Sequence, residues 1–102
     1  MEIEDFGKRL VELRMDKGVS ARDMSLSIGQ NHGYINDIEN GHACPTMEKF
    51  FYICDYLGIT PQEFFDLETP DPIKTKRLYQ ETHSLSSRQL DILLAVAREM
   101  KK

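Results

Sequence analysis

Apolar residues recur every three or four positions along the first part of the chain, which is the period of an amphipathic helix. The first repeat lies close to the N-terminus and consists of Ile3, Phe6, Leu10 and Leu13. Gly18 follows it, and a glycine just beyond a periodic stretch often ends a helix. The pattern therefore predicts a helix from about Ile3 to Lys17, with one apolar face and one charged face.

Two shorter helices are predicted within residues 20–41. Their apolar residues form two narrow faces with spacings of four and three: Met24 with Ile28, and Ile35 with Ile38. Ser20 is a candidate N-cap, with Asp23 completing an aspartate version of the capping box. Gly29 lies where the chain must turn between the helices, and Gly41 can end the second one in the left-handed conformation. Two short helices joined by a glycine-containing turn are typical of a helix-turn-helix.

A fourth and longer helix is predicted to start after Thr46, its candidate N-cap, and to end at Gly58. Its apolar residues are too many for a single stripe: Met47, Phe50, Phe51, Ile53, Cys54 and Leu57. Some of these side chains are therefore expected to face a second surface. Thr60 and Pro61 then open a short fifth helix, in which Phe64 is the best core candidate.

The last third of the chain has a different pattern. Residues 68–72 contain two prolines, which predict a stiff linker and a domain boundary. Residues 73–102 then begin with a basic, weakly patterned helical stretch and restart at a capping box formed by Ser86 and Gln89. The final helix carries two apolar stripes, which are Leu90, Leu93, Leu94, Ala97 and Met100, and Ile92 with Val96. One stripe would suffice for docking on the chain's own domain, whereas a doubled face predicts burial against a partner subunit.

The segment from Phe6 to Phe65 resembles the phage repressor/Cro-type (lambda repressor-like) helix-turn-helix family. Four features carry the resemblance, and they occur in the family's order: Leu13-Arg14, the stretch Ser20 to Gly29, the run from Tyr34-Ile35 through Ile38-Glu39 to Gly41, and Pro45-Thr46 before an apolar helix ending at Leu57-Gly58-Ile59. The resemblance implies an all-α fold. A five-helix DNA-binding domain would occupy residues 1–67, and a C-terminal helical extension would follow it.

The resemblance also implies that a helix at residues 31–40 enters the major groove of double-stranded DNA. Candidate base contacts lie on and just before this helix: Asn31, His32, Gly33, Asn36 and Asp37. Amide, carboxylate and imidazole groups can all pair with base edges there. The alternative is that Asn31 merely caps the helix and that the other polar residues are only solvated. Gly33 is explained equally by a close approach to DNA and by a turn at the helix entry.

Contacts to the DNA backbone and one structural ion pair follow from the same resemblance. The expected backbone contacts are Arg22, Tyr34 and the amides at the start of the fourth helix, at Thr46 and Met47. The family usually places a glutamine directly after the capping serine, but here that residue is Ala21, so one expected contact is missing. The arginine and glutamate that pair in the family are matched by Arg14 and Glu39, and we expect a partly buried ion pair.

Charge is unusual for a chain that binds DNA. Residues 1–68 carry six Lys/Arg and thirteen Asp/Glu, a net charge of −7, whereas residues 69–102 carry seven and four, a net charge of +3. No Lys or Arg occurs between Arg22 and Lys49. Because neutralising phosphates supplies most non-specific affinity, this gap predicts weak, salt-sensitive or assembly-dependent binding.

Composition excludes several other functional classes. A chain of 102 residues with 40% hydrophobic content suits one small core and leaves little room for a catalytic cleft. The pattern shows neither a membrane span nor a secretory signal, so we expect a cytoplasmic protein without membrane contact. Cys44 and Cys54 are expected to be a loop thiol and a buried core thiol. No nucleophile and base, glycine-rich phosphate loop or zinc-site spacing is present, and so no enzyme activity, cofactor, metal or small-molecule ligand is expected.

Two functional hypotheses remain. The leading one is a sequence-specific transcriptional regulator that binds an operator as a homodimer, with dimer contacts at Leu90, Leu93, Leu94 and Ala97. The second is a protein-interaction adaptor or anti-repressor whose acidic helix-turn-helix surface no longer binds DNA. The scarcity of lysine and arginine near the predicted recognition helix is the best support for the second hypothesis.

Overall fold

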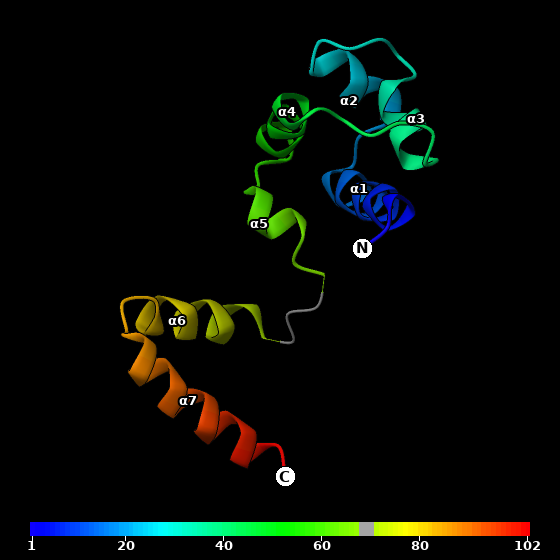
Figure 1. Cartoon of the computed structure of the whole chain (residues 1–102). Coiled ribbons are helices and arrows are strands. Elements are labelled where there is room, and N and C mark those ends of the chain that lie inside the picture. The colour runs from blue at the N-terminus through cyan, green and yellow to red at the C-terminus, as the bar shows by residue number, and fades with distance from the viewer. Residues whose placement is uncertain (68–70) are drawn as a thin grey trace. The chain divides into compact units, whose positions relative to one another are not determined.

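The chain divides into two compact units, Met1–Leu67 and Glu68–Lys102, which we call the N-terminal unit and the C-terminal unit. The computed structural model describes residues 1–67 and 71–102, and within these residues the only regular elements are seven α-helices (Figure 1). The N-terminal unit contains α1 (Ile3–Lys17), α2 (Ala21–Ser27), α3 (Tyr34–Glu39), α4 (Met47–Leu57) and α5 (Pro61–Phe64). The C-terminal unit contains α6 (Pro72–Thr82) and α7 (Ser87–Met100). The predicted all-α fold is confirmed.

Local capping explains where the helices of the N-terminal unit begin. The hydroxyl of Ser20 accepts a 3.0 Å hydrogen bond from the Asp23 N–H and so caps α2. Thr46 Oγ1 accepts from the Lys49 N–H at 3.2 Å and caps α4. Thr60 caps α5 through a reciprocal capping box. All three N-caps predicted for the N-terminal unit are confirmed, although at Ser20 the described hydrogen bonds include only one half of the predicted capping box.

Glycines end the helices where the sequence placed them. Gly18 follows α1 with φ +78° and Gly58 follows α4 with φ +74°, both in the left-handed region that a side chain with a Cβ rarely adopts. Gly41 ends α3 in the same way, with φ +76°. There the N–H groups of Gly41 and His42 donate to the carbonyls of Ile38 and Asp37 at 3.1 and 2.9 Å. This pair of bonds is a Schellman motif, which satisfies carbonyls left free at the helix end.

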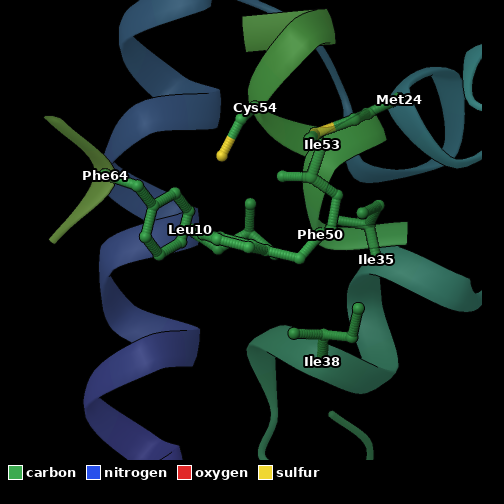
Figure 2. Close-up of a cluster of buried hydrophobic side chains, with 8 residues drawn as sticks. All are labelled: Leu10, Met24, Ile35, Ile38, Phe50, Ile53, Cys54 and Phe64. Atoms are coloured by element: carbon green, nitrogen blue, oxygen red, sulfur yellow. The ribbon is translucent and has the colours of Figure 1, made fainter. Parts of the chain in front are cut away.

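The core of the N-terminal unit draws side chains from all five of its helices (Figure 2). The buried hydrophobic residues are Leu10, Met24, Ile35, Ile38, Phe50, Ile53, Cys54 and Phe64. Phe50 and Phe64 meet edge to face, with ring centroids 5.1 Å apart, a geometry that adds about 0.5–1.5 kcal/mol beyond area burial. The predicted core roles of Phe64 and Cys54 are confirmed. On α4, Met47 and Phe51 remain exposed, so this helix does face two environments.

Arg9 holds α5 against α1. Its guanidinium donates to three backbone carbonyls at the end of α5: Nε to Phe64 at 2.6 Å, and Nη2 to Glu63 at 2.9 Å and Asp66 at 3.0 Å. A four-residue helix leaves its last carbonyls without helical partners, and the guanidinium donates to them. The negative end of the helix dipole also stabilises a cation placed there. Nothing in the local sequence pattern identifies this contact, because the partners are 54 to 57 residues apart.

Gly7 lies in the interior of α1 and is buried against the end of α3. A Cβ built on Gly7 would lie 2.7 Å from the carbonyl oxygen of Glu39 and 2.9 Å from that of Ile38. Glycine inside a helix costs about 1 kcal/mol relative to alanine, so it requires a compensating gain. The gain here is the direct approach of the α1 backbone to the last residues of α3.

The C-terminal unit buries little of its own surface. In α7 no residue is buried, and the exposed fractions of Leu90, Leu93 and Leu94 are 40%, 39% and 50%. The capping box predicted at Ser86 and Gln89 is confirmed by bonds of 2.9 and 3.2 Å. Of the linker predicted at 68–72, residues 68–70 lie outside the described part. Asp71 is the N-cap of α6 and Pro72 is its first residue, so α6 begins inside the predicted linker.

Within residues 1–67 and 71–102, none of the helices combines enough length with enough apolar character to cross a bilayer.

We expect Gly7→Ala to destabilise the N-terminal unit, because the added methyl group meets backbone oxygens that can move only with α3. The gain in helix propensity offsets part of this cost, which leaves a net loss of about 1–3 kcal/mol in the free energy of unfolding. Urea denaturation followed by circular dichroism measures it. Gly33→Ala is the matched control, because a Cβ there meets only the Asn31 Oδ1 at 3.8 Å. Equal stability of both variants would contradict the close approach.

Candidate nucleic-acid interface

α3 separates its apolar and polar residues cleanly. Ile35 and Ile38 are buried in the core, whereas Asn36 and Asp37 are exposed on the opposite side of the helix. Within the described residues the side chains of Asn36 and Asp37 make no hydrogen bond or ion pair. Their amide and carboxylate groups are therefore free to bind an external partner.

A hydroxyl group fixes the start of α3 to α2. Ser25 is fully buried, with an exposed fraction of 0%. Its Oγ accepts from the Ile35 N–H at 2.9 Å and donates to the Ala21 carbonyl at 2.7 Å. The first N–H groups of a helix lack helical partners, so a buried one needs an outside acceptor. Ser25 supplies that acceptor and thereby sets the position of α3 against α2.

The end of α3 is fixed by an ion pair. The structure brings Arg14 and Glu39 together in a bidentate contact, with Nε to Oε2 at 2.7 Å and Nη2 to Oε1 at 3.0 Å. Arg14 also donates to the Val19 carbonyl at 3.0 Å. The two side chains are 17% and 7% exposed, so both charges are largely removed from water. Hydrogen bonding to Glu39 raises the pKa of Arg14 above its ordinary value, while burial acts in the opposite sense.

The segment before α3 forms a turn, and this corrects the predicted helix at 31–40. α3 begins only at Tyr34 and ends at Glu39. Asn31 does not cap it: its Oδ1 accepts from the Gly33 N–H at 3.1 Å, which is an Asx turn, and Gly33 itself is the N-cap residue. His32 and Asn31 are exposed within this turn. The five candidate base contacts thus lie on the turn and on the first four residues of α3.

Tyr34 does not present its hydroxyl to the outside. The Oη atom is buried and has no hydrogen-bond partner in the described residues, and burial raises the pKa of the phenol above its ordinary value. The phosphate contact predicted for this hydroxyl is therefore not available in the observed arrangement. Instead the Tyr34 ring makes a cation–π contact with Lys49, whose Nζ lies 5.4 Å from the ring centroid.

The other predicted backbone contacts are exposed. Arg22 lies in the first turn of α2 and makes no ion pair within residues 1–67 and 71–102. Met47 is the first residue of α4, with 66% of its side chain exposed. The Thr46 hydroxyl is engaged as the N-cap of α4. It therefore holds the helix end, and only the backbone there remains as an anion contact.

Three residues that contact α3 were not assigned from the sequence pattern: Ser25, Lys49 and Gly7. The role of Ser25 depends on a partner ten residues away, and that of Lys49 on a residue of another helix. Neither leaves a periodic signal. For Gly7 a signal did exist, since a glycine inside a strong helical repeat normally has a packing reason.

These features define a helix-turn-helix unit with an exposed polar edge on its second helix, and comparison with known proteins agrees. The family model described as Helix-turn-helix matches residues 10–64, more than half of the 102-residue chain. The chain belongs to this family, and the predicted membership in its phage repressor/Cro type is confirmed.

Among solved structures, the chain is similar to the restriction-modification controller protein C.AhdI from Aeromonas hydrophila. The two share 30% sequence identity with a TM-score of 0.59, over 62% of this chain and 91% of that chain. A search of curated proteins finds no match. The family and this neighbour support the class of DNA-binding regulators.

We expect Glu39→Ala to destabilise the protein strongly, because it leaves the Arg14 guanidinium buried without its counter-charge. Breaking one side of a buried pair costs about 3–5 kcal/mol, which appears as a lower midpoint in thermal or urea denaturation. Glu12→Ala is the control: it removes the mostly exposed carboxylate that lies 3.4 Å from Arg9, and exposed pairs contribute at most about 1 kcal/mol. An unchanged melting curve for Glu39→Ala would contradict a stabilising role for the pair.

Proposed function

We propose that the protein is a sequence-specific transcriptional regulator that binds an inverted-repeat operator as a homodimer. In this proposal α3 lies in the major groove, and Asn31, His32, Gly33, Asn36 and Asp37 face the bases. The dimer would span two half-sites about one helical turn apart and act by excluding or recruiting polymerase. C.AhdI, to which the chain is similar, is a restriction-modification controller protein, which supports a regulatory role.

The observation that carries this proposal is the way α3 is held. Its two ends are fixed by the Ser25 hydroxyl and the Arg14–Glu39 pair, and its buried face by Ile35 and Ile38. Its outward polar residues have no internal partners among the described residues. A recognition helix must keep its register against the groove, because base pairing requires hydrogen-bond geometry within a few tenths of an ångström. A helix fixed at both ends and on its buried face meets this requirement for reading base edges.

The charge of the N-terminal unit favours a second candidate function. With six Lys/Arg against twelve Asp/Glu, residues 1–67 carry a net charge of −6. Long-range repulsion from phosphates weakens encounter with DNA, and it is least screened at low salt. An adaptor that uses the same polar edge to bind another protein would have no such penalty. The regulator would bind duplex DNA, whereas the adaptor would bind none.

We expect the full chain to bind duplex DNA, and Asn36→Ala to weaken binding to a selected sequence by about 5- to 150-fold, since a bidentate base contact contributes about 1–3 kcal/mol of discrimination. A sequence is first selected from a random duplex library, and binding is then measured by fluorescence anisotropy at about 50 and about 200 mM salt. Asn40→Ala is the matched control: it makes the same change at the exposed far end of α3. No binding to any duplex at the lower salt would support the adaptor.

The dimer part of the proposal depends on α7. Leu90, Leu93, Leu94 and Ala97 follow one another at helical spacing and are exposed. Soluble monomers rarely expose a contiguous apolar stripe of this kind. A second copy of the same helix offers the matching surface under two-fold symmetry. Two-fold symmetric homodimers are the commonest soluble oligomers.

We expect Leu93→Glu to convert a dimer to a monomer, because it places a carboxylate in the centre of the apolar stripe. Sedimentation equilibrium or light scattering after size-exclusion chromatography measures the mass. The control is Ala95→Glu, which adds the same charge about 200° around the helix from Leu93 at 3.6 residues per turn. A wild-type chain that is monomeric at every concentration, or a dimer that tolerates Leu93→Glu, would contradict the assignment.

A further inference from the structure

We propose that Lys49 is the phosphate-contacting cation at the DNA-facing end of α3, held there by the ring of Tyr34. This inference rests on the proposed function and names a residue that neither the sequence pattern nor the helix-turn-helix motif indicates. The geometry is a cation over an aromatic face, with Lys49 Nζ 5.4 Å from the centroid of the Tyr34 ring. Tyr34 is the first residue of α3, and recognition helices contact DNA through their N-terminal residues.

Of the six cations in residues 1–67, two are bound to other groups of the protein, and Arg22 is exposed on α2. Arg9 is bound to the carbonyls at the end of α5, and Arg14 to Glu39 at the end of α3. Lys17 lies over the ring of Tyr56 on α4, at 5.0 Å. Lys8 follows Gly7, which packs against the last residues of α3 and not against its start. Within residues 1–67, Lys49 is the one cation that lies over the ring of Tyr34, the first residue of α3.

The charge of Lys49 is not neutralised by the protein. No carboxylate of the described residues forms an ion pair with it. The neighbouring Glu48 is engaged with another group, since its Oε1 accepts a 2.6 Å hydrogen bond from the Tyr52 hydroxyl. Lys49 is also the third residue of α4, where the positive end of the helix dipole disfavours a cation. A lysine in this place is therefore unfavourable for the helix, and apart from the Tyr34 ring its charge is left to an external anion.

The test is the salt dependence of binding to a fluorescein-labelled random-sequence duplex, measured by anisotropy between about 20 and about 200 mM KCl. Loss of one phosphate contact lowers the slope of log K against log salt by about 0.9 per bound copy. We expect this change for Lys49→Gln, with affinity about eightfold weaker per copy near 0.1 M salt. Lys49→Arg should retain the wild-type slope, because it keeps the charge.

Lys17→Gln is the matched control. It removes the same charge from a lysine that also lies over a tyrosine ring, so the net charge of the protein changes equally. Its slope should equal that of the wild type. A slope change shared by both variants would overturn the inference, since it would report net charge and not a contact.

One further variant separates the contact from effects on folding. Lys49→Met keeps the aliphatic stem and should reproduce the slope of Lys49→Gln. Melting curves of all variants verify that they are folded. If the wild type binds and Lys49→Gln keeps its slope, the inference about Lys49 fails alone. If the wild type binds no duplex even at the lowest salt, the proposed function fails and this inference with it.

Discussion

The fixed position of α3 is the constraint on which the rest of the structure depends. A helix of six residues is far too short to be stable in water by itself, so its geometry must come from tertiary contacts. The Ser25 hydroxyl holds its start and the Arg14–Glu39 pair holds its end. The missing side chain of Gly7 lets the α1 backbone close against that end. The same contacts that complete the core therefore also determine which polar groups α3 presents.

This construction has an electrostatic consequence. Two of the six cations in residues 1–67 are guanidinium groups bound to the protein itself, Arg9 on backbone carbonyls and Arg14 on a carboxylate. Their charges stabilise helix ends and are not available to phosphates. An acidic unit of this kind gains little from non-specific attraction, so its affinity for any duplex must depend more on specific contacts and on assembly. On the proposed function, sequence selectivity would then be obtained at the expense of general DNA affinity.

Much of the fold could be predicted from the sequence because its signals are local. Helix caps involve residues within one helical turn of each other, so a single sequence predicts them. This holds for the N-caps Ser20, Thr46 and Thr60 and for the glycines that end helices. The predicted start of α3 was wrong because the Asn31 side chain accepts a hydrogen bond from the Gly33 N–H. The turn formed in this way takes the place of a helix cap at Asn31. The burial of the Tyr34 hydroxyl and the partners of Arg9 depend on packing between helices distant in sequence, and no periodicity encodes them.

The C-terminal unit poses a different physical problem from the N-terminal one. α7 has fourteen residues, none of them buried, and isolated helices of about this length are marginal in water. Its capping box contributes roughly 1 kcal/mol, which is small against the cost of ordering the chain. In the proposed dimer, burial of the apolar stripe would supply the missing free energy, and helix formation and assembly would be a single equilibrium. The helix content of this unit would then rise with protein concentration, and on the proposed function the affinity for an operator would depend on the concentration of the protein itself.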